Sequence, residues 1–363
     1  MKNSELISFG DTLYWGNGLT NTCEVELSMI ARRTLWQFII VPLVILSWGV
    51  GCHLWASTTE TKTEQVHTPV RYQLPKSTLE KPLTFAGELI PLDRPDVRSR
   101  IVSQVNFLLL DAGSVLADWL TEKTRYSWLI EEVFRKEGVP LEFALLEPVL
   151  SGVQRNSSKS AGVGVWLLET TCTSSEGVEM SDDNWHDDRM DLELSTRCFA
   201  SRIKAIRKDL VGGSWLLAAA AYVTSPKIIQ DSQLKWNSNS FWDIPLPPVA
   251  EQLICRWIAL SVISSNRSVY GLKFKPHSSV GFDQVTGIVL TRDLSVADIA
   301  RMTGDPPRAI LQINLKVKPS GPVFPAKVQG KAVTHTILAP KGKGQLLVDK
   351  LRNAGYVISE SNN

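Results

Sequence analysis

Carboxylate side chains provide most of the groups in this chain that could do acid–base or metal chemistry. Glu147 lies within an apolar run, Glu169 follows a glycine-rich turn, and five aspartates crowd the segment 182–191. A carboxyl group whose pKa is raised by an apolar pocket can act as a general acid near neutral pH, and clustered aspartates are candidates for a metal site or an acid pair. The five histidines are scattered and the five cysteines lack CxxC spacing. The sequence therefore predicts no His or Cys metal site and no cofactor.

Helical patterns surround these carboxylates and would position them. Apolar residues recur at helical spacing after Asp96, which is a candidate N-cap. Gly138 is the C-cap signal of a second helix, and the run WLLAAAAY is apolar enough to predict a buried helix. The helices expected from these patterns span 96–120, 126–137, 141–151, 195–210 and 215–222, and a further buried helix lies within 241–263.

One stretch, residues 140–166, carries a recognisable motif, PLEFALLEPVLSGVQRNSSKSAGVGVW. An apolar helix containing a proline, followed by a glycine-rich turn that ends in tryptophan, resembles the core motif of the lytic transglycosylases, and most closely their membrane-bound murein transglycosylase D subgroup. These lysozyme-fold enzymes cleave the glycan strands of bacterial peptidoglycan. The segments PLDRPDVRSRI, HDDRMDLELST, SWLLAAAAY and FWDIPLPPVAEQLICRWIALSVI also follow the family's order between Pro91 and Ile263. The resemblance implies a mainly α, lysozyme-like domain over 85–270 with a glycan groove.

The residues that perform the family's chemistry are replaced in this chain. The resemblance implies a glutamate that acts first as general acid and then as base, and counting from Pro148 places Ser151 in its slot. A serine hydroxyl is far too weak an acid for this role. Leu167 and Val223 occupy the slots of a glutamine and an asparagine. We therefore predict no catalytic residue at these positions. The residues expected to contact glycan are Ser151, which replaces the glutamate, and the retained Gly164, Trp166 and Tyr222.

Two other carboxylates are alternative acids. Glu147 precedes Ser151 by four residues and would share its helix face, although Pro148 biases it away from helical geometry. Glu169 lies just beyond the glycine-rich turn. For both, a solvated surface carboxylate is the favoured interpretation. In the family pattern the segment from Asp187 to Asp191 looks structural, with capping and pairing around Arg189, so the aspartates are not predicted to bind metal.

The N-terminal part of the chain predicts attachment to a membrane. Residues 34–59 contain no Asp, Glu, Lys or Arg, and 34–55 are long and apolar enough to span a bilayer. Arg32 and Arg33 place residues 1–33 in the cytoplasm by the positive-inside rule. Alternatively, a start at Met29 gives a lipoprotein-like signal that ends at Cys52. Residues 56–84 are rich in polar residues and proline and predict a flexible tether.

The C-terminal part, residues 287–351, resembles a LysM-type module, a small α/β fold that binds N-acetyl sugars. The segment DLSVADIARMTGDPPRAILQINLKV predicts helix, turn and helix, with Asp293 or Ser295 as the N-cap. The alternative interpretation is a packing domain without glycan contacts. In an oxidising compartment, one disulfide among Cys172, Cys198 and Cys255 is expected, and the sequence leaves the pair open.

Three functions follow as hypotheses for this 363-residue chain. A net charge of +2 indicates no nucleic-acid partner. The favoured hypothesis is a non-catalytic, periplasmic, peptidoglycan-binding protein of the bacterial envelope. It would be anchored in the inner membrane or by lipid at Cys52, and would form part of a secretion or conjugation machine with protein partners. The alternatives are an active lytic transglycosylase that uses Glu147 or Glu169 as a relocated acid, and a protein-interaction scaffold.

Overall fold

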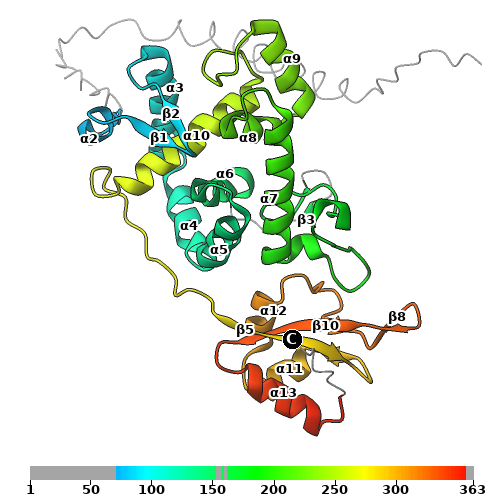
Figure 1. The fold of residues 1–363 in the computed structure, drawn as a ribbon. Coiled ribbons are helices and arrows are strands. Elements are labelled where there is room, and N and C mark those ends of the chain that lie inside the picture. Colours follow the sequence, from blue (N-terminus) through cyan, green and yellow to red (C-terminus); the bar gives the residue numbers. More distant parts are fainter. Residues whose placement is uncertain (1–70, 153–156, 159–161, 357–363) are drawn as a thin grey trace, which may run out of the picture. The chain divides into compact units, whose positions relative to one another are not determined.

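The computed structural model describes residues 71–152, 157–158 and 162–356. Most of this part of the chain is helical, as expected (Figure 1). The predicted cytoplasmic segment 1–33, the apolar segment 34–55 with Cys52, and the first part of the 56–84 tether lie outside the described residues. Within the described ranges, no single helix has the length and composition to cross a bilayer. The pair Pro95–Asp111 and Gly113–Lys123 meets that criterion only when taken together, and it is bent by 92°.

A short hairpin and a long helix begin the main helical region. After α2 (Lys76–Leu79), strands β1 (Leu83–Phe85) and β2 (Glu88–Ile90) pair antiparallel. Helix α3 (Pro95–Asn106) follows and continues as one π-helical turn, η2 (Phe107–Asp111). The prediction that Asp96 is the N-cap is wrong, because Arg94 is the cap and proline occupies the first helical position, where its missing N–H costs nothing.

The single helix predicted over 96–120 is wrong, because the chain bends by 92° between Asp111 and Gly113 and α4 is a separate helix. The other predicted helices of this region are present in the predicted order, with shifted ends. Helix α5 ends at Gly138, whose φ of 67° is the left-handed C-cap that the sequence indicated. Helix α7 begins earlier than expected because the Asp191 side chain caps it. Helix α9 was not predicted. The elements are α4 (Gly113–Lys123), α5 (Ser127–Glu137), the 3-10 helix η3 (Leu141–Leu145), α6 (Leu146–Ser151), α7 (Leu192–Asp209), α8 (Trp215–Val223), α9 (Pro226–Trp236) and α10 (Pro248–Ser265).

Aromatic residues from separate segments form the core of the helical region. Phe143 lies 4.6 Å from Trp257 and 6.0 Å from Phe199, measured between ring centroids, and Trp166 stacks on Phe199 at 4.2 Å. Aromatic pairs in this range contribute about 0.5–1.5 kcal/mol each beyond their area burial. Helix α8 runs through the core and is buried from Trp215 to Ala221, as its composition predicted.

A disulfide closes the segment between the glycine-rich turn and α7. It joins Cys172 to Cys198, whose Cα atoms are 5.8 Å apart. Cys255 is a buried free thiol in α10. The structure thus selects one of the pairings that the sequence left open, and a disulfide of this kind is typical of proteins in oxidising compartments.

The C-terminal residues form a second, smaller hydrophobic core of their own. Strands β5 (Phe282–Val289) and β10 (Thr334–Pro340) pair antiparallel, and helices α11 (Val296–Thr303) and α12 (Pro307–Ile313) lie between them in sequence (Figure 1). Ser295 caps α11, whereas the Asp293 carboxylate accepts a hydrogen bond from the Ala326 amide. Because β5 begins at Phe282, the predicted boundary at 287 falls inside this strand. We call residues 282–356 the C-terminal module. Its other elements are β6 (Leu294–Ser295), β7 (Val323–Phe324), β8 (Lys327–Val328), β9 (Lys331–Ala332) and α13 (Gly344–Asn353).

Candidate functional site

The end of α6 carries no ionisable side chain. Ser151 is its last residue, and Gly152 caps it with a φ of 64°. The Ser151 hydroxyl is half-buried and donates a hydrogen bond to the Glu147 carbonyl oxygen at 3.1 Å, so this contact stays within the helix. The residues from Val149 to Gly152 are Val, Leu, Ser and Gly. A shift of the family register by one position would therefore still place no acid in this turn.

Glu147 differs from the sequence prediction in its conformation and burial. Pro148 does not exclude it from the helix, because both residues lie in the first turn of α6, where a proline is tolerated. The Glu147 side chain is only 2% exposed, so the prediction of a solvated carboxylate is wrong. A general acid must come within hydrogen-bond reach of the group that it protonates. Because its side chain is buried, the Glu147 carboxyl group is not accessible to a substrate that approaches from solvent.

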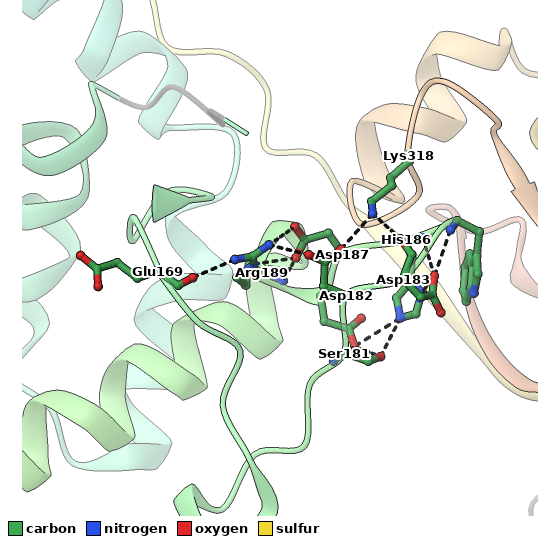
Figure 2. A network of polar contacts seen from close by, with 10 residues as sticks. Glu169, Ser181, Asp182, Asp183, His186, Asp187, Arg189 and Lys318 are labelled. Carbon is green, nitrogen blue, oxygen red and sulfur yellow. Dashed lines mark hydrogen bonds and ion pairs between the residues drawn. The ribbon is translucent and has the colours of Figure 1, made fainter. Parts of the chain in front are cut away.

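Glu169 is exposed, as predicted. Its backbone oxygen accepts a hydrogen bond from Arg189 Nη1 at 3.0 Å, and its carboxylate points away from Arg189 (Figure 2). Neither alternative acid therefore has the combination of an apolar pocket and access to substrate that the chemistry requires.

Trp166 belongs to the core and does not face a cleft. Its side chain is fully buried, stacks on Phe199 with an interplanar angle of 16°, and donates from Nε1 to Thr196 Oγ1 at 2.9 Å. These contacts contradict the predicted role of Trp166 as a stacking platform for sugar. The indole N–H has its hydrogen-bond partner inside the protein, as buried tryptophans usually do.

Tyr222 fixes the position of the glycine-rich turn. Its hydroxyl donates to the Trp166 carbonyl oxygen at 2.6 Å, and its ring meets Phe199 edge-on at 4.9 Å. Burial raises the pKa of the Tyr222 hydroxyl well above its usual value, so it stays protonated and remains a donor. Val223 follows it as the half-buried last residue of α8. Contacts inside the protein therefore hold Tyr222 and Trp166 together, and with Trp166 the neighbouring Leu167.

Gly164 is required by the close approach of another backbone segment. It has a φ of 74°, and a Cβ atom built on it would overlap the carbonyl oxygen of Arg189. Leu167 in the same turn has a φ of 51°, a left-handed conformation that is unfavourable for residues other than glycine. The turn is closed by paired backbone hydrogen bonds between Val163 and Leu168, at 3.0 and 2.9 Å. Gly164 thus acts through the backbone, without offering a group to glycan.

The aspartate-rich segment holds Arg189, as the sequence predicted. Arg189 binds Asp187 through Nε at 2.9 Å and through Nη2 at 2.8 Å, and Nη2 also contacts Asp182 at 2.8 Å (Figure 2). Asp191 caps α7 by accepting from the Glu193 and Leu194 amides. Within the part of the chain that the structure describes, no group of His, Cys, Asp and Glu side chains is placed to hold a metal ion. The predicted pairing around Arg189 and capping by this segment are present in the structure.

A cluster of polar side chains around His186 in the same segment was not predicted. Ser181 Oγ lies 2.9 Å from His186 Nε2, and His186 Nδ1 lies 2.8 Å from Asp183 Oδ1 (Figure 2). These distances match a Ser–His–Asp triad. However, the Asp188 carboxylate also accepts from the Ser181 hydroxyl, at 3.2 Å, and lies 3.5 Å from Nε2. A negative charge at this place opposes the alkoxide and oxyanion that a nucleophilic serine would develop.

The ionisation of His186 supports the same conclusion. Burial lowers the pKa of His186, but hydrogen bonds and charge from Asp188 and Asp183 together raise it above its ordinary value of 6.5. This shift favours the protonated imidazole, which cannot take a proton from serine. Asp188 shows the matching effect, because the bond to His186, the Ser181 amide and the Lys316 charge outweigh burial and lower its pKa. The cluster is therefore an ion-paired latch, which we define as Ser181, Asp183, His186 and Asp188.

The latch lies where the helical region meets the C-terminal module. The Asp187 amide donates to the Lys316 carbonyl oxygen at 2.9 Å, and the Lys318 amide donates to the Trp185 carbonyl oxygen at 2.8 Å. Lys318 Nζ binds the Asp182 carboxylate at 2.8 Å and also contacts the Asp183 carbonyl oxygen (Figure 2). The Trp185 ring packs on Phe324 of the module, with centroids 5.8 Å apart. The aspartate-rich segment thus connects the module to α7.

His186 and His335 make opposite contributions to the pH dependence of stability at the contact between the helical region and the C-terminal module. The pKa of His186 is raised on folding, so its contribution to stability is complete below pH 6.5 and is lost as the pH rises through the folded value. Burial lowers the pKa of His335 in the module, so its contribution is complete above pH 6.5 and is lost as the pH falls. We expect the melting temperature of the wild type to fall as the pH rises above 6.5. His186→Gln should flatten this alkaline decline, and His335→Gln should flatten only the acidic one. Calorimetry that finds the wild-type alkaline slope in His186→Gln would contradict the latch.

Comparison with known proteins gives one consistent result. No protein-family model matches the chain. Over 282 residues it is 25% identical to proteins named membrane-bound lytic murein transglycosylase D from Escherichia coli strain K12 and from Escherichia coli O6:H1. The match includes 76% of this chain and 59% of each relative, so the chain spans less than two thirds of their length. The similarity, together with the mainly helical fold, supports a relationship to the lytic transglycosylases.

Proposed function

We propose that this chain binds peptidoglycan in the bacterial envelope without cleaving it, as a structural part of an envelope-spanning secretion or conjugation machine. One observation supports the proposed loss of catalysis. The last turn of α6, where the resemblance places the general acid, is built from Val149, Leu150 and Ser151 and ends at Gly152. The alternative acids do not compensate, because Glu147 is sealed and Glu169 is solvated.

The positions that correspond to the centre of the family's glycan groove are expected to bind glycan weakly. Leu167 and Val223 replace amide side chains with apolar ones, and each sugar hydroxyl left without a partner costs about 1–3 kcal/mol. Trp166 offers no compensation because it is buried. Affinity for peptidoglycan must therefore come from other surfaces, and the LysM-like C-terminal module is the main candidate.

Envelope location is supported by two independent features. The Cys172–Cys198 disulfide suits an oxidising compartment, and the chain is similar to proteins named membrane-bound murein transglycosylases. Attachment through 34–55, or through lipid at Cys52, completes the proposal. In either arrangement the described residues would lie on the periplasmic side, within reach of the cell wall.

Removal of the C-terminal module tests this division of roles. A chain that ends at Ser279 should bind isolated sacculi about tenfold more weakly in a co-sedimentation assay, a difference of about 1.4 kcal/mol. Ser151→Ala should bind like the wild type. The truncated chain should keep its fold, since every buried member of the helical core precedes residue 271, and circular dichroism checks this.

The other outcomes are equally informative. If the truncated chain binds sacculi as well as the wild type, the module is only a packing domain. If neither chain binds sacculi, the peptidoglycan-binding proposal is wrong and a protein-interaction scaffold becomes the better account.

A further inference from the structure

Two neighbouring hollows lie along the contact between the helical region and the C-terminal module and together make up a groove. The inner hollow has a volume of about 190 Å³ and the outer one about 530 Å³. Both are lined by Leu129 of α5, Glu193 of α7, and Phe282 and Gln284 of β5. Because the same side chains border both hollows, the two hollows lie next to each other. We call this the seam groove. None of the degenerate slots, Ser151, Leu167 and Val223, lines it.

The outer hollow presents an aromatic surface. Trp128, near the start of α5, is 37% exposed, and its ring centroid lies 5.6 Å from that of half-buried Phe282. An exposed indole face is the kind of flat apolar surface on which a sugar ring can stack. Trp128 therefore offers what the buried Trp166 cannot, on a different helix.

The polar groups of the groove carry both signs of charge. In the outer hollow, Lys136 pairs with Glu132 at 2.7 Å, while Lys341 is 76% exposed and contacts Asp283 at 3.2 Å. In the inner hollow, Lys316 Nζ lies 3.7 Å from the Asp191 carboxylate. Charged donors of this kind form strong hydrogen bonds with carboxylates, and acidic side chains do the same with amines. The groove thus offers partners for a ligand that carries both groups.

This combination of features selects among ligand classes. A polyanion such as nucleic acid requires an excess of cations, whereas the cations of this groove alternate with acids. A helical peptide requires a hydrophobic groove for its apolar anchors at i, i+3, i+4 and i+7. The inner hollow has apolar side chains such as Leu192, Leu315 and Leu338, but charged side chains line much of the outer one, namely Glu132, Lys136, Glu137, Arg197 and Lys341. A sugar that bears a short zwitterionic peptide matches both the aromatic surface and the mixed charges.

We propose that the seam groove is a binding site for peptidoglycan fragments in which an N-acetylated sugar stacks on Trp128 and the attached peptide meets the charged side chains. The proposal rests on the proposed function and adds a location to it. It also gives the contact between the helical region and the C-terminal module a role in ligand binding. A ligand in the groove would touch α5 and α7 of the helical region and β5 of the module.

Isothermal titration of the full chain with a disaccharide–tetrapeptide muropeptide tests the site. Trp128→Ala should raise Kd about tenfold or more, equivalent to about 1.4 kcal/mol, and Lys341→Gln should raise it to a smaller extent. Trp236→Ala is the matched control, because Trp236 is 49% exposed on α9 and does not line the groove. Chitotetraose, which has acetylated sugars but no peptide, should bind more weakly than the muropeptide and should still respond to Trp128→Ala.

Failure of the site and failure of the proposed function give different results. If the wild type binds the muropeptide and Trp128→Ala and Lys341→Gln bind it equally well, the seam groove is not the site, although peptidoglycan binding stands. If chitotetraose binds as tightly as the muropeptide and Lys341→Gln has no effect, the assignment of the charged side chains to the peptide is wrong. If the wild type binds neither the muropeptide nor sacculi, the proposed function fails, and the seam groove fails with it.

Discussion

Sacculi incubated with the purified protein should release no 1,6-anhydro muropeptides detectable by mass spectrometry. The proposed loss of a general acid alone would remove about two to four orders of magnitude of rate, and with Leu167 and Val223 in the proposed amide slots two further polar groups would be missing. The described acids near the slot do not replace it, because Glu147 is 2% exposed in the core and Glu169 lies in water. The expected release is therefore too slow to detect in this assay.

Restoring variants make this expectation specific. Ser151→Glu alone should not restore release, and neither should Leu150→Glu, the control for a family register shifted by one position. The triple variant Ser151→Glu, Leu167→Gln and Val223→Asn is the fair test of whether the fold can still support the chemistry. Release by the unmodified protein that disappears in Glu147→Gln or Glu169→Gln would establish a relocated acid. Release that survives both substitutions would show that Ser151 does not mark the acid slot.

Gly164→Ala should destabilise the helical region severely, by about 3 kcal/mol or more in the free energy of unfolding. Part of this loss, about 1–2 kcal/mol, is the cost of a left-handed conformation for an L-residue. The rest comes from the Arg189 carbonyl oxygen, which a Cβ atom would overlap. Because Arg189 is fixed by Asp187 and Asp182, this backbone cannot easily move away. Urea denaturation measures the effect.

Gly177 provides a matched control for this substitution. Its φ of 76° is nearly that of Gly164, but a Cβ atom there meets nothing within 4 Å. Gly177→Ala should therefore show the conformational cost alone, about 1–2 kcal/mol, and the difference between the variants measures the steric part. Equal losses in the two variants would mean that the approach of Arg189 to the glycine-rich turn is looser than the structure has it.

Helix periodicity predicted the buried faces well, because the pattern and the packing share one cause. Val97, Ile101, Val105 and Leu108 occur at helical spacing, and all four are fully buried. The glycine signal at Gly138 and the apolar composition of α8 worked for the same reason, since each depends on local backbone or burial preferences. Helix α9 was missed because its apolar residues Ile228 and Leu234 are exposed and form no simple stripe.

The site was harder to predict because its residues are ambiguous in isolation. Tryptophan suits both a cleft and a core, and only the positions of Phe199 and Thr196 decide that Trp166 is internal. A glutamate inside an apolar run looks solvated by composition, yet the packing around α6 buries Glu147. The latch around His186 depends on Lys316, about 130 residues away in sequence, and no local pattern encodes that contact. The crowding of His186 among aspartates was the available signal.

A single co-sedimentation assay tests the central claim most directly. The full chain is mixed with isolated sacculi, the pellet is scored for bound protein, and the supernatant of the same tube is analysed for anhydro-muropeptides. The account predicts protein in the pellet and no released products. Released products would contradict the loss of catalysis, and protein that stays entirely in the supernatant would contradict peptidoglycan binding.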